Sequence, residues 1–90
     1  MILLLAILVA SCGAARSFSR GDSAARSGNW DEAVEHYRRA VQQNPSRTDY
    51  KIALERAMIN ASHMHLDQAR LLEVRGNLDE ALREYRLASE

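Results

Sequence analysis

The stretch Ser46–Gly76, SRTDYKIALERAMINASHMHLDQARLLEVRG, decides the architecture of this chain because nothing inside it interrupts a helix. It contains no proline, and its single glycine is its last residue. Ser46 is a favourable N-cap with Asp49 three residues later, and Gly76 suits the left-handed position that ends many helices. We therefore predict one helix over residues 47–75, about 29 residues and roughly 44 Å long. A helix of this length needs partners along its sides.

Two segments of similar sequence flank this helix. The first is GNWDEAVEHYRRA at 28–40, and the second is GNLDEALREYRLA at 76–88. They align without a gap and share Gly, Asn, Asp, Glu, Ala, Tyr, Arg and Ala in the same order. Each has an Asn and a Glu spaced for a capping box, followed by apolar residues at three- and four-residue spacing. We therefore predict an internal repeat of two helices, joined through the long one.

The long helix carries apolar residues on two faces. Its main face holds Tyr50, Leu54, Ala57, Met58, Ala61, Ala69 and Leu72. On another face, Ile52, Ile59 and Leu66 recur every seven residues. A helix that is apolar on two sides is expected to pack between neighbours. His65 falls within the main face, so we expect it to pack with one ring nitrogen hydrogen-bonded.

The repeated pattern resembles the second half of a tetratricopeptide repeat, a helix-turn-helix unit of about 34 residues. The resemblance implies an all-α fold: tetratricopeptide-like hairpins, as in a fragment of an α-solenoid, with about four helices that share the long one. Its units would be residues 14–45 and 62–90 within a domain at 12–90. The first helix would begin at Ser17 or Ser19 and end before Gly28.

Family positions that pack the helices together carry over to nine residues here. They are Gly21, Ala33, Tyr37, Ala40 and Pro45 in the first unit, and Ala69, Ala81, Tyr85 and Ala88 in the second. The units are offset by 48 residues, where tandem units would be offset by about 34. We expect the longer central helix to absorb the difference.

The N-terminus begins with nine apolar residues at 2–10, too few for a membrane span of about 20 but typical of a secretory signal. The run ends in VASC at 9–12, which resembles the bacterial lipobox. The resemblance implies a signal peptide at 1–11, a lipid on Cys12 and a mature chain facing the periplasm. Gly13 is not the Asp of an inner-membrane retention signal, which favours the outer membrane. The alternative is an uncleaved segment with a buried Cys12.

Composition and motifs exclude several classes of function. Twelve basic and twelve acidic side chains are interspersed and give a formal charge of zero, so we expect no nucleic-acid partner. No glycine-rich phosphate loop or nucleophile signature is present, and the spaced pair His63 and Asp67 has no third ligand. We therefore expect no enzymatic activity, cofactor, metal or small-molecule substrate.

The resemblance implies a non-enzymatic interaction or scaffold module, bound to the bacterial envelope by its lipid. The concave face made by the first helices would present Phe18, Asp22, Ala25 and Arg26 and, on the long helix, His63 and Leu66. The candidate partner-binding residues are Phe18, Asp22 and Arg26 on this face, and Trp30 on the second helix. Trp30 either anchors a partner or packs at the helix start. A lipobox followed by such a unit is also similar to the N-terminal segment of secretin-type outer-membrane channel proteins. The alternative function is therefore a leading segment of a type II secretion component, with secretion or envelope-assembly proteins as partners.

Overall fold

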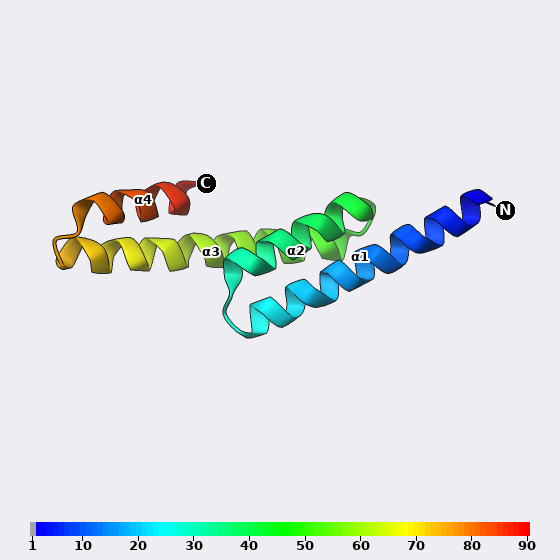
Figure 1. Ribbon diagram of the computed structural model, residues 1–90, viewed down its shortest axis with the longest axis horizontal. Helices are drawn as coiled ribbons and strands as arrows, with labels where there is room; N and C mark the ends of the chain where they lie inside the picture. The colour runs from blue at the N-terminus through cyan, green and yellow to red at the C-terminus, as the bar shows by residue number, and fades with distance from the viewer. Residues whose placement is uncertain (1) are drawn as a thin grey trace.

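The computed structural model describes the backbone of residues 2–90 and the side chains of residues 12–90. Its helices are α1 (Ile2–Arg26), α2 (Trp30–Gln43), α3 (Thr48–Val74) and α4 (Leu78–Ser89). No strand is found among residues 2–90. The predicted all-α fold, with hairpins that share one long unbroken helix, is confirmed (Figure 1).

The molecule is a rod with α3 as its spine. Figure 1 shows α2 along the N-terminal part of α3, α4 along the C-terminal part, and α1 beside α2. The principal extents are 62 × 21 × 17 Å and the radius of gyration is 16.6 Å, against about 12 Å for a compact chain of this length. The long spine therefore separates the two hairpins instead of folding them onto each other.

Both hairpin turns close in the same way. After α1, the Asn29 amide donates to the Ala24 carbonyl at 2.9 Å, and the Gly28 amide donates to the Ala25 carbonyl at 3.0 Å. This Schellman arrangement requires a left-handed residue, and Gly28 supplies it with φ of 77°. The same pair of bonds follows α3, where Gly76 has φ of 83°. The two copies of Gly-Asn thus end one helix and begin the next.

The start of α1 differs from the prediction. A first helix beginning at Ser17 or Ser19 is wrong, because α1 runs without a break from Ile2. Small residues and two glycines, Gly13 and Gly21, near the expected start do not interrupt the helix. Ser17 lies inside it and its hydroxyl donates to the Gln43 side chain at 2.9 Å. Residue 1 and the side chains of 2–11 lie outside the described part, so cleavage after residue 11 stays a prediction.

Helix capping also differs in detail. Arg47, not Ser46, is the N-cap of α3, and the Ser46 hydroxyl donates instead to the Asn44 side chain at 2.8 Å. Asn29 and Asn77 occupy the predicted N-cap positions of α2 and α4, but neither makes a side-chain capping hydrogen bond. The acidic residues in the first turns still favour these helix starts through the helix dipole.

The core is made of alanines and two tyrosines. Its buried hydrophobic residues are Ala14, Ala24, Ala33, Tyr37, Ala40, Tyr50, Ala57, Ala61, Ala69 and Ala81. Met58, expected on the main face of α3, is exposed. In the second stripe, Ile52 is 45% and Ile59 52% exposed, whereas Leu66 is half-buried. The expectation of packing on both sides of α3 is wrong there, because α2 and α4 follow each other along one stripe.

Candidate functional site

A groove runs between α1 and α3, with α2 as its floor. It is lined by Phe18, Asp22 and Ala25 of α1, by Trp30 and Tyr37 of α2, and by Asp49, Ile52, Ala53, Arg56, Ala57 and Asn60 of α3. The open space that it encloses is about 450 Å³. Three helices therefore contribute to one surface, and residues far apart in the sequence meet there.

Aromatic side chains hold the floor of the groove together. The rings of Phe18 and Tyr50 stack with centroids 4.5 Å apart, and the rings of Phe18 and Tyr37 are 5.4 Å apart. The Tyr37 hydroxyl donates to Asp22 at 2.6 Å. Burial, and then this bond to Asp22, raise the pKa of Tyr37 to about 12. The floor is thus a rigid, neutral aromatic surface at ordinary pH.

Gly21 lets α1 and α2 approach closely enough to form this floor. A Cβ at Gly21 would lie 2.5 Å from both Cδ1 and Cε1 of Tyr37, so no larger residue fits without moving the ring. Among the nine packing positions carried over from the family, those buried are Gly21, Ala33, Tyr37, Ala40, Ala69 and Ala81. Tyr85 and Ala88 are half-buried, and Pro45 lies exposed in the turn before α3.

The four predicted partner-binding residues divide into two groups. Phe18 and Trp30 are half-buried. Each packs against the core on one side and lines the groove on the other. Asp22 also lines it but is engaged by Tyr37. Arg26 is exposed, is not among the lining residues, and donates to the Ser23 hydroxyl at 3.2 Å. Sequence reasoning thus placed three of the four in one groove.

α3 contributes a wall to the groove, but not through His63 and Leu66, the residues expected on the binding face. Ile52 and Arg56 line it one helical turn apart. The seven-residue recurrence of Ile52 and Ile59 was the signal, but it was interpreted as a packing face. Asp49, at the end of this wall, accepts from Arg47 at 2.8 Å, and this bond lowers the pKa of Asp49. Arg56 has no ion-pair partner among residues 12–90.

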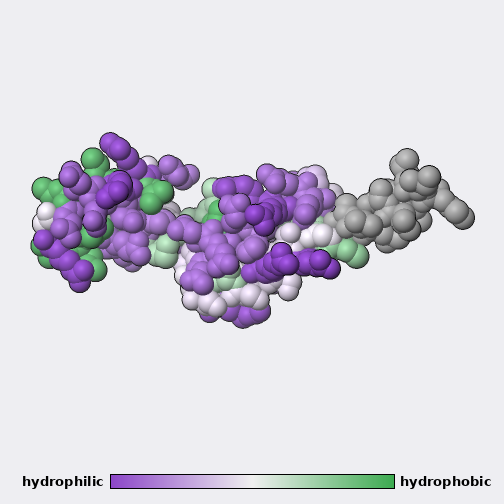
Figure 2. All heavy atoms as spheres, in the orientation of Figure 1, coloured by the Kyte–Doolittle hydropathy of each residue, from purple (hydrophilic) through white to green (hydrophobic). Residues whose placement is uncertain are grey.

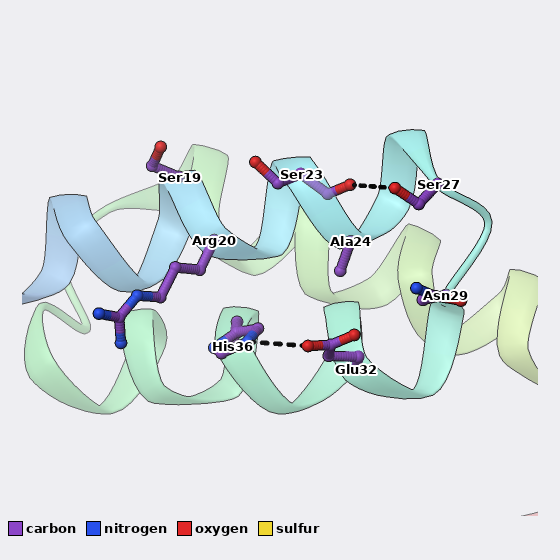
Figure 3. Close-up of a pocket in the computed structure, with 8 residues that line it drawn as sticks. All are labelled: Ser19, Arg20, Ser23, Ala24, Ser27, Asn29, Glu32 and His36. Atoms are coloured by element: carbon purple, nitrogen blue, oxygen red, sulfur yellow. Dashed lines mark hydrogen bonds and ion pairs between the residues drawn. The ribbon is translucent and has the colours of Figure 1, made fainter.

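A second, polar hollow lies between α1 and α2 (Figure 3). Arg20 extends into it from α1, opposite Glu32 and His36 of α2. The His36 Nε2 atom lies 3.8 Å from the Glu32 carboxylate, and its buried Nδ1 atom has no hydrogen-bond partner among the described side chains. Serines make up much of the remaining lining. With no aromatic floor, this hollow is a poorer place for a protein partner than the groove.

Other expected features can be placed as well. Cys12 is exposed, which contradicts the alternative in which it is buried. His63 and Asp67 are both exposed on α3. Among the described side chains, no group of three or more His, Cys, Asp or Glu converges as metal ligands. Within the described residues, no helix combines the length and apolar character that crossing a membrane requires.

His65 joins the two hairpins in a way the sequence did not predict. Its Nδ1 atom lies 2.5 Å from Glu84 of α4, and its Nε2 atom lies 2.8 Å from Asp31 of α2. The expectation that a single ring nitrogen would be bonded is therefore wrong. Asp31 and Glu84 come from different helices, and their convergence on α3 has no signature in the sequence.

Residues 14–47 match the family model described as the tetratricopeptide repeat. This segment is therefore similar to a tetratricopeptide repeat. It spans α1 from Ala14, all of α2 and the turn up to α3, and repeats of this kind are typically non-enzymatic units that bind other proteins. No curated protein and no solved structure matches the chain. The likeness of the second hairpin to the repeat therefore rests on its agreement with the first.

Proposed function

We propose that this chain is a non-enzymatic scaffold whose protein partner binds in the groove between α1 and α3. One observation carries the proposal: the aromatic-floored groove opens beside large apolar residues of α3 that the fold leaves uncovered, Ile52 and Ile59. Aligned exposed apolar residues beside a groove are typical of surfaces that a partner covers. Phe18 and Trp30 supply the aromatic contacts that dominate such interfaces.

The charges around the groove indicate the partner's chemistry. Asp22 and Asp49 already accept hydrogen bonds from Tyr37 and Arg47, whereas Arg56 has no ion-pair partner among residues 12–90. A segment with an apolar side chain between Phe18 and Ile52 and a carboxylate near Arg56 fits this arrangement best.

Site-specific photo-cross-linking in the native host tests the groove. We expect a photoreactive residue at Ile52 to give one discrete adduct with another protein. The same residue at Leu82, equally exposed but on α4, is the matched control and should not give that adduct. Adding Arg56→Glu should weaken the Ile52 adduct, since it reverses the charge at the rim. The same adduct from both positions, or none from Ile52, would count against the groove.

We propose further that Cys12 carries the lipid that holds the scaffold on the envelope. Support comes from the apolar run before Cys12 and from the exposure of its side chain. The chain should incorporate a labelled fatty acid and fractionate with membranes, whereas Cys12→Ser should do neither. Equal label in both forms would rule the anchor out. Density-gradient separation of the membranes tests the outer-membrane location, which Gly13 favours over the inner membrane.

The alternative function, as the leading segment of a type II secretion channel component, rests on the order of the lipobox and the repeat alone. It makes a distinct prediction about the cross-linked protein. Under this alternative the adduct from Ile52 contains a secretion component, and mass spectrometry of the adduct identifies it. An adduct with an unrelated envelope protein would retain the scaffold and reject the secretion role.

A further inference from the structure

His65 lies where the end of α4 meets the start of α2. Its side chain is 11% exposed, and its two ring nitrogens contact carboxylates on two different helices, Asp31 at the start of α2 and Glu84 on α4. Both contacts are short, at 2.8 and 2.5 Å. A single ring on the spine thus connects both hairpins to each other as well as to α3.

The chemistry of imidazole makes this connection depend on a proton. A neutral ring has one N–H and one lone pair, so it can donate to only one of the two carboxylates. An ionised carboxylate can only accept hydrogen bonds. The unprotonated nitrogen of a neutral ring would therefore point its lone pair at a carboxylate oxygen, and the two would repel each other. The imidazolium ion donates from both nitrogens and makes two charge-assisted hydrogen bonds. The geometry around His65 therefore fits the protonated ring.

The other charged groups around the ring favour the same state. From α2 the hollow beside His65 receives Asp31, Glu35 and Arg38, and from α4 it receives Glu90, with Glu84 bonded to the ring itself. Acidic groups outnumber the single guanidinium. Burial alone would lower the pKa of His65, but the hydrogen bonds and charges of Glu84 and Asp31 outweigh it and raise the pKa above its usual value.

α4 packs along α3, but it buries little apolar surface there. Ala81 is its only buried residue, and Leu78 and Leu82 are 65% and 51% exposed. A second link is the Ser62 hydroxyl, which donates to the Ala88 carbonyl at 2.5 Å. Because so little apolar surface is buried, each charge-assisted hydrogen bond supplies a substantial share of the free energy that holds this helix in place.

We propose that His65 is a proton-dependent clamp that fixes α4 beside α2 and makes the joint between the two hairpins stiff. Because the folded chain holds the His65 proton more tightly than the unfolded chain, the clamp is complete below pH 6.5, the ordinary histidine pKa. It is lost as pH rises through the higher pKa of folded His65. Above that pH, α4 keeps at most one of the two bonds and its position loosens.

Histidine NMR and amide hydrogen exchange on the full chain test the clamp. We expect His65 to titrate above pH 6.5, the ordinary histidine pKa. Protection factors of α4 amides, corrected for intrinsic exchange, should fall about tenfold relative to those of α2 over the His65 titration. His63→Gln is the matched control and should leave this change in place. His65→Gln should abolish the change, because α4 protection at low pH should already be as low as that of the unaltered chain at high pH.

Two results would overturn the clamp. One is a His65 that titrates at or below pH 6.5 in the unaltered chain, a measurement that needs no variant to fold. The other is α4 protection that stays constant relative to α2 while His65 loses its proton. Either result leaves the groove proposal standing, because the cross-linking position Ile52 lies 13 residues before His65 on α3, about 20 Å along the helix.

Discussion

The two hairpins share a motif but differ in how much of it they bury. In the first, α2 buries Ala33, Tyr37 and Ala40, whereas in the second, α4 buries only Ala81. The difference arises because α2 packs between α1 and α3, whereas α4 packs along α3 alone in the described part of the chain. In Figure 2, hydrophobic side chains accordingly gather at the end of the rod where α3 meets α4. A repeated sequence therefore sets helix and turn, and the environment sets burial.

Corresponding positions of the two hairpins also differ in the way the helices are joined. Gly21 in the first hairpin aligns with Ala69 in the second, and the Tyr37 ring lies close over Gly21. Ser17 aligns with His65, so a neutral hydroxyl bond to Gln43 in the first hairpin is replaced by two contacts with carboxylates in the second. Close packing stabilises the first hairpin, and polar contacts supplement sparse packing in the second.

Truncating the repeated tyrosine should give the largest difference between the hairpins. Tyr37→Ala is expected to lower the free energy of unfolding by about 3–4 kcal/mol, because it empties a fully packed site. Tyr85→Ala should cost less than about 2 kcal/mol, because that ring is only half-buried. Urea unfolding followed by far-UV circular dichroism measures both. Equal losses would mean that the two hairpins are packed alike.

Adding a methyl group at Gly21 of α1 tests how closely α1 and α2 pack in the first hairpin. Gly21→Ala should destabilise the fold by about 1–3 kcal/mol, since its Cβ would overlap the Tyr37 ring. Gly13→Ala is the matched control in the same helix, where the nearest atom to the new Cβ is Gln43 Nε2 at 3.5 Å. It should be neutral or stabilise the helix by up to about 1 kcal/mol. Thermal unfolding of the two variants compares them directly, and a harmless Gly21→Ala would contradict the close approach.

Polar replacement of aligned apolar residues should show the smallest effect. Leu82→Gln is expected to change stability by no more than about 0.5 kcal/mol, since the side chain is already exposed. The aligned change Val34→Gln should cost about 1 kcal/mol or more, because Val34 packs against the core that contains Ala57. Chemical denaturation resolves the difference. A marked loss for Leu82→Gln in the isolated chain would show that the face of α4 is covered after all.

Much of the fold could be predicted because local sequence patterns determine where its helices and turns lie. The absence of helix breakers after Ser46 predicted the spine, and the two Gly-Asn pairs predicted both turns. The site was harder to predict, because its walls come from different helices. Phe18 and Asp22 were identified through the resemblance, and Trp30 as an aromatic residue of the kind that dominates interfaces. Ile52 and Arg56 were not identified, because which stripe of a two-faced helix stays uncovered depends on where its neighbours lie.

The sequence by itself determined the helices, their turns and the small residues that let them approach, because these follow from backbone sterics and from the spacing of side chains along one helix. Only the tertiary structure decided which apolar residues stay in water and that His65 meets both Asp31 and Glu84. Those facts depend on how three helices are placed along a fourth, and distances between side chains remote in sequence are fixed only by that placement.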